Sequence, residues 1–486
     1  MICDDGIDCT EDRCSEPSGE CEAIPNDTFC ADANSCTADS CGPTGCTNSP
    51  LEDETICDTG VCIDGNCCAG CVDEAGRCQA GDSVIACGSG GVSCGGCPCS
   101  SDRCDGVGCP PDYLRAVQLA AGEYHTCARM LGGDIYCWGR NIQGQLGLGD
   151  RTPRRRPVRV GSETDWSHIA TQHSHTCGIR VRGTRREIHC WGAGTSGQLG
   201  NGRSSSLDLP TALDTDRADW DDVATGQFHT CATTRSQLLY CWGGNPSGQL
   251  GIPSSTGELT PAPVGEGTSI AGSWRSVSLG SEQTCGVRQA PGATETQLYC
   301  WGGGSVGALG LGDFMNRTLP TQLLGTDWAQ PFLGYRHSCA TLTPGQVACW
   351  GLNRSGEAAR PPSETFVTMP IGADASTDWR SISLNGAAPP FSGGNTCGVK
   401  SDGTLWCWGE ASGGRLGMGP GAITDLSRPT RVGDSNDWFS VAVGARHSCA
   451  LKRDGTVWCW GDGSGYQLGL GDGRPRNTPT RVCFPE

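Results

Sequence analysis

Short groups of apolar residues recur from residue 113 onward at a spacing of about fifty residues, separated by polar, glycine-rich turns. The most visible group is Cys-Trp-Gly followed by Gly-x-Leu-Gly. Its six complete copies cover residues 137–147, 190–200, 241–251, 300–310, 407–417 and 459–469. A seventh copy begins at Cys349, but there Gly356-Glu357-Ala358-Ala359 replaces the second half. We therefore expect an irregular turn in that repeat.

A second cysteine precedes each Cys-Trp-Gly, usually after His-Thr or His-Ser. The seven resulting pairs are Cys127 with Cys137, Cys177 with Cys190, Cys231 with Cys241, Cys285 with Cys300, Cys339 with Cys349, Cys397 with Cys407, and Cys449 with Cys459. An Asp-Gly midway through each of the last two pairs predicts a short hairpin. Cysteines opposed across antiparallel strands lie near disulfide distance, so we interpret the pairs as disulfides, each adding roughly 2–3 kcal/mol. Metal binding by reduced pairs would need further ligands at zinc spacing, which the repeats lack.

Two more strands complete the repeat. One begins at a tryptophan eleven residues before the first cysteine of most pairs, and the other carries a Pro-x-x-Val line. Four strands per repeat and seven repeats predict an all-β fold, a seven-bladed β-propeller over residues 113–486. The first repeat has Ala116 in place of the tryptophan, whereas the chain ends with an additional Pro479-Thr480-Arg481-Val482. We expect this C-terminal strand to complete the first blade and to bring Cys483 near Cys104 or Cys109.

The motifs His-Thr-Cys-Ala, Gly-Thr-Val-Trp-Cys-Trp-Gly (residues 455–461) and Gly-Gln-Leu-Gly resemble the regulator-of-chromosome-condensation repeat family across residues 113–486. The resemblance implies a seven-bladed propeller, and the cysteine-paired variant is similar to that of exported bacterial members. The best-known member of the family is a nuclear exchange factor for a small GTPase. A fold transfers more reliably than an activity, and no segment here matches the exchange-active surface, so no residue is carried over.

The N-terminal region is separate in composition. Residues 1–112 hold 22 Asp and Glu against three Arg, a net charge of −19, and the total of −18 leaves +1 for the remaining chain. Cysteine runs over residues 1–67 resemble the short repeats of slime-mould and myxobacterial secreted or surface proteins, and residues 68–112 form a second cysteine-rich segment and linker. With few large apolar residues, both segments depend on disulfides, and we expect a loop-rich stalk.

Thirty-five cysteines favour an oxidising compartment, which predicts an extracellular or cell-surface location. No export signal precedes Cys3, so we infer that the natural N-terminus is missing from this sequence. The odd cysteine total leaves the states of Cys3 and Cys483 open. No apolar stretch approaches the roughly 20 residues of a transmembrane helix.

Candidate chemistry is sparse. A histidine two residues before the first cysteine recurs, with Gln283 and Asn395 in two repeats, at His125, His175, His229, His337 and His447. Glutamine and asparagine can replace histidine in hydrogen bonding but not in ligand chemistry, so we interpret these residues as structural groups that bind backbone partners within each blade. The acidic run 4–8 lacks the spacing of known calcium loops, and calcium binding there stays a minor alternative.

No motif nominates a catalytic residue, a metal site or a cofactor. No basic cluster is larger than Arg154-Arg155-Arg156, so the near-neutral propeller lacks the basic surface that nucleic-acid binding requires, and we expect no nucleic-acid partner. We interpret the triplet as a solvated loop, with a phosphate contact as the alternative. The leading hypothesis is a monomeric, extracellular binding protein, not an enzyme, that recognises an unidentified protein or glycan. Its candidate loops are Pro291-Gly292-Ala293-Thr294 and the insertion Asn385 to Gly394 on one propeller face. The alternatives are guanine-nucleotide exchange on a small GTPase and a polysaccharide-acting enzyme with its site in the central channel.

Overall fold

The computed structural model divides the chain into two compact units, residues 1–113 and 114–486. It describes strands between Thr10 and Gln79 and residues 115–265, 272–386, 393–421 and 424–485. The predictions of calcium binding at residues 4–8 and of a partner for Cys483 at Cys104 or Cys109 lie outside the described residues. Cys483 is disulfide-bonded.

The first unit consists of short antiparallel strands. They form four small sheets: β1 (Thr10–Ser15) with β2 (Glu20–Pro25), β3 (Thr37–Gly42) with β4 (Gly45–Pro50), β5 (Ile56–Cys57) with β6 (Gly60–Ile63) and β7 (Asn66–Cys68), and β8 (Cys71–Val72) with β9 (Cys78–Gln79). The register places Cys14 opposite Cys21 and Cys41 opposite Cys46.

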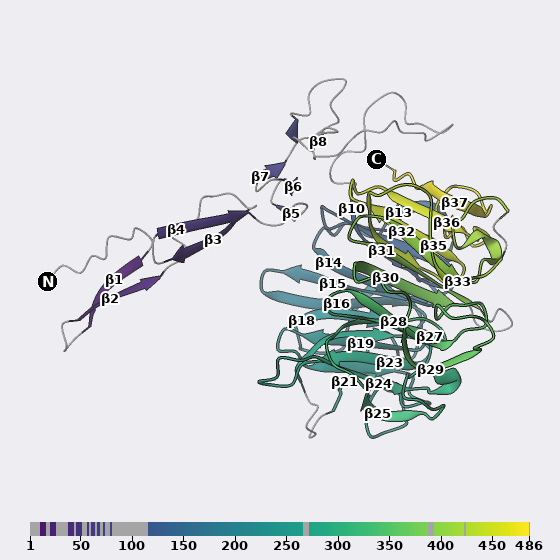
Figure 1. The fold of residues 1–486 in the computed structure, drawn as a ribbon, viewed down its shortest axis with the longest axis horizontal. Coiled ribbons are helices and arrows are strands. Elements are labelled where there is room, and N and C mark those ends of the chain that lie inside the picture. Colours follow the sequence, from purple (N-terminus) through teal and green to yellow (C-terminus); the bar gives the residue numbers. More distant parts are fainter. Residues whose placement is uncertain are drawn as a thin grey trace. The chain divides into compact units, whose positions relative to one another are not determined.

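The second unit is a seven-bladed β-propeller, as predicted, and each blade is a four-stranded antiparallel sheet of consecutive strands. The inner strands of neighbouring blades contact one another around the axis (Figure 1). These inner strands are β10 (Ala116–Ala121), β14 (Trp166–Thr171), β18 (Trp220–Thr225), β22 (Trp274–Leu279), β26 (Trp328–Leu333), β30 (Trp379–Gly386) and β34 (Trp438–Val443). The second strands are β11 (His125–Met130), β15 (His175–Arg182), β19 (His229–Thr234), β23 (Gln283–Arg288), β27 (His337–Leu342), β31 (Gly394–Lys400) and β35 (His447–Lys452).

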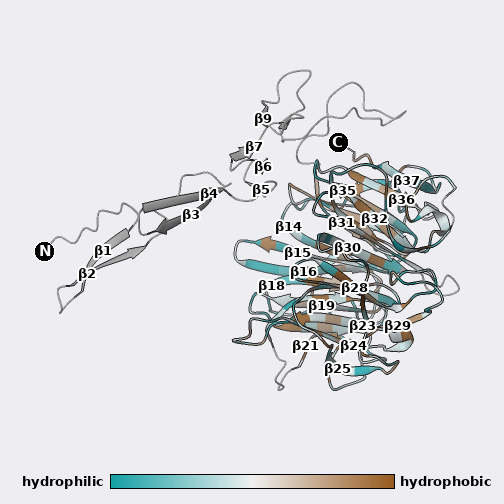
Figure 2. Cartoon of the chain, in the orientation of Figure 1, coloured by the Kyte–Doolittle hydropathy of each residue, from teal (hydrophilic) through white to brown (hydrophobic). Residues whose placement is uncertain are grey.

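The third and outer strands finish each blade. The third strands are β12 (Ile135–Gly139), β16 (Arg185–Gly192), β20 (Leu239–Gly243), β24 (Gln297–Gly302), β28 (Gln346–Leu352), β32 (Leu405–Gly409) and β36 (Val457–Gly461). The outer strands are β13 (Arg154–Arg159), β17 (Leu207–Ala212), β21 (Glu258–Pro263), β25 (Arg317–Gln322), β29 (Phe366–Gly372), β33 (Leu426–Arg431) and β37 (Arg476–Arg481). Two short 3-10 turns, η3 (Ser305–Gly307) and η4 (Ser412–Gly414), lie in loops. Every outer strand contains a proline, which protects an exposed sheet edge; β25, for example, is mostly polar (Figure 2).

A disulfide joins the second and third strands of every blade. The seven bonds link Cys127 to Cys137, Cys177 to Cys190, Cys231 to Cys241, Cys285 to Cys300, Cys339 to Cys349, Cys397 to Cys407, and Cys449 to Cys459. These are the pairs named from the sequence. The two cysteines of a pair face each other in the antiparallel register, with Cα atoms 4.0–4.2 Å apart. All fourteen side chains are fully buried, so they form part of the packed core of each blade.

Neighbouring blades are joined by a repeated hydrogen-bond clamp. The carbonyl oxygen of Gln145, the second residue of Gly-Gln-Leu-Gly, accepts from Thr176 Oγ1 at 2.9 Å and from Trp191 Nε1 at 3.0 Å in the next blade. The same double acceptance occurs at every blade junction, through the carbonyls of Gln198, Gln249, Ala308, Glu357, Arg415 and Gln467. The Gly-x-Leu-Gly turn of one blade and the recurring Thr and Trp of the next blade are therefore the two halves of one inter-blade contact.

The recurring histidines belong to the same junctions, which corrects the expectation that they bind backbone within their own blade. Nε2 of His125 lies 3.0 Å from Thr176 Oγ1 and 2.8 Å from Thr171 Oγ1, both in the next blade. Because Thr176 donates its hydroxyl proton to Gln145, it accepts from the histidine. Complete burial lowers the pKa of His125 to about 3, so the ring is neutral. Gln283 and Asn395 also bind across blades, to Gly334 O and Ser448 Oγ.

Replacement of Thr176 by valine should destabilise the propeller by about 1–2 kcal/mol, because two buried hydrogen bonds lose their shared hydroxyl. Thr176→Ser is the matched control, since Ser338 and Ser448 already serve at the same position in other blades. The midpoint of thermal unfolding should fall clearly for the valine variant and little for the serine variant. Equal midpoints for the two variants would contradict the clamp.

The ring closes differently from the prediction. Strand β37 completes the last blade, where Arg481 lies opposite Trp458, and it does not complete the first. The first blade has its own inner strand, β10, in which Ala116 takes the register position of Trp166. A bond from Ala116 N to Gly455 O, 3.1 Å long, links β10 to the last blade.

A side chain near the C-terminus supplies the aromatic ring that the first blade lacks at Ala116. Phe484 packs edge-on against Tyr136 and Trp138, with ring centroids 5.6 and 5.7 Å apart. Trp166 makes the same two contacts in the second blade, with His189 at 5.7 Å and Trp191 at 5.8 Å. Phe484 therefore stands in for the tryptophan that Ala116 replaces.

The expectation of an irregular turn at residues 356–359 is wrong. Ala359 N donates to Gly356 O at 2.9 Å, as Gly310 N donates to Gly307 O at 3.0 Å in the preceding blade. Ala359 adopts a φ of 58°, close to the 72° of Gly310, so an alanine accepts the left-handed position of a glycine. The clamp through Glu357 O keeps the turn in its regular shape.

Candidate functional site

The propeller has two unlike ends. At the end that we call the loop face, inner strands connect to second strands and third strands connect to outer strands. The hairpins between second and third strands lie at the opposite end, the hairpin face. Because strands alternate in direction, the two predicted recognition loops lie on opposite faces. Pro291–Thr294 belongs to the hairpin between β23 and β24, whereas Asn385–Gly394 joins β30 to β31. Residues 387–392 of the second loop lie outside the described residues.

The axis is closed at the loop face by hydrogen bonds that cross it. Gln172 Nε2 of the second blade donates to Leu333 O of the fifth blade at 2.7 Å, and Asn385 Nδ2 of the sixth blade donates to Gln172 O at 3.5 Å. A shallow pocket above these bonds has lining residues from every blade: Glu123, Gln172, His173, Gln227, Gly280, Ser281, Tyr335, Asn385 and Ala445. We call this pocket the mouth of the axis. Because the hydrogen bonds close the axis here, the mouth is part of the surface of the loop face.

One carboxylate faces this mouth. Glu123 Oε2 lies 3.0 Å from His173 Nε2. Burial acts to raise the pKa of Glu123, but the hydrogen bond and charge of His173, with help from Arg140, outweigh burial and hold the pKa below its ordinary value. Among the described lining residues Glu123 has no second carboxylate beside it, whereas glycoside hydrolysis ordinarily uses a pair. In the parts of the chain that the structure describes, no group of three or more His, Cys, Asp or Glu could hold a metal ion.

Aromatic and arginine side chains surround the mouth. The guanidinium of Arg140 lies 5.2 Å from the ring of Tyr124, and that of Arg336 lies 5.4 Å from the ring of Tyr335. Phe228 packs 6.3 Å from His173 and leaves 36% of its surface exposed. Tyrosine, phenylalanine and arginine are the residues that protein interfaces favour. We call Tyr124, Arg140, Phe228, Tyr335 and Arg336 the loop-face ring.

No motif in the sequence points to these residues, yet a signal for them exists. The two positions directly before the recurring histidine, or before Gln283 in the fourth repeat, vary from repeat to repeat: Glu123-Tyr124, His173-Ser174, Gln227-Phe228, Ser281-Glu282, Tyr335-Arg336 and Ala445-Arg446. The repeat places every such pair on the loop face, beside the axis. An alignment of the repeats to each other would therefore have found Tyr124, Phe228, Tyr335 and Arg336, whereas Arg140 follows the third strand and lies in a different loop.

The basic triplet is also placed differently from the prediction. Arg154, Arg155 and Arg156 begin the outer strand β13 and do not form a loop. Arg154 pairs with Asp150 at 2.5 Å, and Arg155 stacks on Tyr466 with 4.9 Å between guanidinium and ring centre. The triplet is thus part of the blade and of its junction with the last blade.

Seven four-stranded repeats around a closed axis, with variable loops gathered at one end, define a β-propeller interaction scaffold. The chain belongs to the regulator of chromosome condensation (RCC1) repeat family, which confirms the resemblance drawn from its motifs. Models of this repeat match residues 116–145, 220–249 and 440–467, and residues 132–179, 187–233, 295–341, 402–451 and 454–486.

Among curated proteins, the chain is 32% identical over 390 residues to the ultraviolet-B receptor UVR8 of Arabidopsis thaliana, which covers 77% of this chain and 83% of that protein. It is 27% identical over 361 residues to the mitochondrial RCC1 domain-containing protein RUG3 of the same plant, covering 69% and 76%. The match to the human E3 ubiquitin-protein ligase HERC2, 26% identical, covers 76% of this chain but 6% of that protein.

Solved structures show the same fold. Prp20p from Saccharomyces cerevisiae aligns with a TM-score of 0.63 at 19% identity, covering 76% of this chain and 88% of that chain. Human WBSCR16 aligns with a TM-score of 0.62 at 20% identity, covering 72% and 94%. Family membership implies a role in protein interaction. No helix in the described parts is long and apolar enough to cross a membrane.

Proposed function

We propose that this chain is an extracellular or cell-surface binding protein whose loop face recognises a protein or glycan. The observation that carries the proposal is the loop-face ring, in which aromatic and arginine side chains surround a closed axis. Such a surface offers apolar area, stacking planes and fixed donors without a catalytic pair. A protein is the partner that this composition favours, because aromatic and arginine side chains supply most interface hot spots.

The proposed location rests on the cysteines. Seven buried disulfides, one per blade, form and persist in oxidising compartments and are rare in the cytosol. Guanine-nucleotide exchange on a small GTPase is the alternative that family membership supports, and it requires a cytosolic or nuclear protein. The compartment therefore separates the two functions.

Non-reducing mass spectrometry of protein recovered from its native host should find all fourteen blade cysteines oxidised in their in-blade pairs, in the secreted or surface fraction. The reason is that each pair is opposed and buried in the same blade. Free thiols in a cytosolic fraction would overturn the proposed location and favour GTPase regulation.

Substitution of Tyr335 and Arg336 together by alanine should weaken binding to the partner by about thirtyfold or more, the effect of removing an interface hot spot. Arg185→Ala is the control, because that side chain is 60% exposed on the hairpin face and pairs only with neighbouring Glu187 among the described residues. Surface plasmon resonance against the partner captured by the wild-type chain measures both variants. Equal affinities for the two would place recognition elsewhere.

A further inference from the structure

One side-chain arrangement recurs in the crevice between each blade and the one before it. The inner-strand tryptophan meets an aromatic or histidine ring from the third strand of the same blade. The ring centroids are 5.7 Å apart for Trp166 and His189, 5.6 Å for Trp220 and Tyr240, 5.8 Å for Trp274 and Tyr299, and 6.2 Å for Trp438 and Trp458. Tyr136 and Trp406 occupy the same place in the first and sixth blades.

A cation completes the arrangement in several blades. Lys400 Nζ lies 4.9 Å from the rings of both Trp379 and Trp406. Lys452 lies in the same way between Trp438 and Trp458. In these two blades the acid that precedes the tryptophan neutralises the cation: Asp378 lies 3.3 Å from Lys400, and Asp437 lies 2.9 Å from Lys452.

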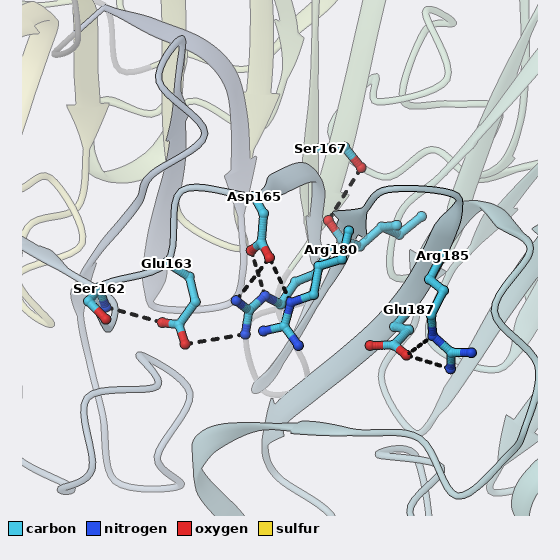
Figure 3. Close-up of polar contacts among 9 residues, drawn as sticks. Ser162, Glu163, Asp165, Ser167, Arg180, Arg185 and Glu187 are labelled. Carbon is cyan, nitrogen blue, oxygen red and sulfur yellow. Dashed lines mark hydrogen bonds and ion pairs between the residues drawn. The ribbon is translucent and has the colours of Figure 1, made fainter.

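The second blade shows the same arrangement with arginine. Arg180 lies 5.3 Å from the ring of Trp166 and bonds to both carboxylate oxygens of Asp165, with Glu163 on its other side (Figure 3). The ring, the cation and the acid thus form one layer that fills the crevice.

The fifth blade keeps the inner-strand tryptophan and the preceding acid, but it lacks the ring of the third strand and the cation. In the other six blades the third strand carries an aromatic or histidine ring at the position of Ala348. On the second strand, Leu342 lies opposite Trp328, whereas the sixth and seventh blades have Lys400 and Lys452 at this position. A cavity of about 730 Å³ opens there, between the fourth and fifth blades. Leu324, Trp328, Leu342, Ala348, Met369 and Asp374 are among its lining residues.

The rim of the cavity is apolar and exposed. Leu324 leaves 86% of its surface exposed and Met369 leaves 52%. Six of the ten exposed large apolar side chains among the described residues lie between Phe314 and Met369, on the loops and outer strands of these two blades. An apolar surface gathered around a preformed cavity is typical of a binding site.

The carboxylate that precedes the tryptophan of the fifth blade lacks the ion pair that its counterparts form in the sixth and seventh blades. Asp327 precedes Trp328, the position from which Asp378 and Asp437 bind a lysine, but within the described residues it has no ion pair. Asp374 adds a second carboxylate to the lining, 4.0 Å from Lys400. The fifth blade therefore keeps the acid but has Leu342 in place of the cation that neutralises it in the sixth and seventh blades.

We propose that this cavity binds an aromatic side chain flanked by lysine or arginine, presented by an extended segment of a partner protein. The ring takes the place that Tyr299 or Trp406 fills in other blades, and the cation takes the place that Lys400 has in the sixth blade, beside the acid Asp327. The chain already contains one such substitution, since Phe484 supplies from a distant segment the ring that the first blade lacks. This surface is separate from the loop-face ring, so a failure of one site leaves the other proposal unaffected.

A fluorescein-labelled synthetic peptide, Gly-Ser-Lys-Trp-Lys-Ser-Gly, tests the proposal by fluorescence anisotropy with the full, oxidised chain. We expect saturable binding, an affinity about thirtyfold lower when alanine replaces the tryptophan of the peptide, and about tenfold lower when glutamate replaces its lysines. Equal binding of the tryptophan and alanine peptides would overturn the proposal.

Ala348→Tyr is the decisive variant, because it restores the ring found in the first, third and fourth blades. It should abolish peptide binding while raising the thermal midpoint of the chain. Leu324→Ser, at the exposed rim, should weaken binding because it removes apolar contact area without adding a charge, and Tyr335→Ala on the loop face should leave peptide binding unchanged. Undiminished binding by Ala348→Tyr would refute the site. A concentration-dependent dimer that this variant abolishes, without any peptide binding, would show that a second copy is the occupant and would also refute the partner assigned here.

Discussion

Replacing Glu357 by glutamine should stabilise the propeller by up to about 3 kcal/mol at pH 8 and leave its stability almost unchanged at pH 4. Glu357 is fully buried at the second position of Gly356-Glu357-Ala358-Ala359, the turn that replaces Gly-x-Leu-Gly in the fifth blade, and four other blades have glutamine at this position. Its Oε2 accepts from Ser355 N at 2.6 Å, as Gln145 Oε1 accepts from Gln143 N at 2.9 Å. Oε1 of Glu357 has no hydrogen-bond partner among the described residues, so an ionised carboxylate is poorly satisfied there.

The direction of the pH dependence follows from the pKa of this group. Burial, with a contribution from the charge of Glu410, raises the pKa of Glu357 from 4.5 to about 7 in the folded chain. Between these values the folded state binds more protons than the unfolded state, so stability falls as the pH rises. The contribution is fully present below about pH 4.5 and is lost as the pH passes through about 7. Glutamine does not titrate, so the variant should lack this decline.

Thermal unfolding of both proteins, followed from pH 4 to pH 8, measures the difference. The matched control is Gln145→Glu, which transfers the same carboxyl to the first blade and should introduce a loss of stability over the same pH range. Parallel pH profiles for wild type and Glu357→Gln would show that Glu357 is ionised and satisfied in the folded chain.

The architecture could be predicted from the sequence because its repeat is long and its motifs are local. The Cys-Trp-Gly strand, the hairpin and the upstream cysteine lie within a few residues of one another, so their pairing follows from alternation and turn chemistry. Contacts between repeats could not be read in the same way. The repeat pattern suggests backbone partners for the histidines within a blade, whereas His125 contacts a threonine about fifty residues away, in the next blade.

The site was harder to predict than the fold, for a physical reason. A sequence insertion marks where a loop is long, but it does not say at which end of a blade the loop emerges, and the two candidate loops emerge at opposite faces. The residues of the loop-face ring lie in loops of ordinary length, and only the residue types differ between repeats. Likewise, the crevice of the fifth blade is visible only when Ala348 and Leu342 are compared with the residues that fill the other blades.

Phe484→Ala should destabilise the propeller by about 2–3 kcal/mol, less than the roughly 3–5 kcal/mol of a fully buried phenylalanine because Phe484 is only half-buried. The loss falls on the junction between the first and last blades, where Phe484 packs with Tyr136, Trp138 and Val482 in one core cluster. An opened junction would expose the inner strand β10 as a free edge. We therefore expect a lower thermal midpoint and more aggregation on heating.

Ala116→Trp provides the rescue that distinguishes ring replacement from a general loss of packing. Ala116 has the register position of Trp166, so a tryptophan there should reach the space that Phe484 vacates. In the presence of Phe484 the new indole should destabilise the chain by overpacking, at a cost of about 1–3 kcal/mol. In the double variant it should restore most of the stability lost by Phe484→Ala. Additive effects of the two substitutions in a double-mutant cycle would mean that the two side chains do not share one space, and the first blade would then close without a substitute ring.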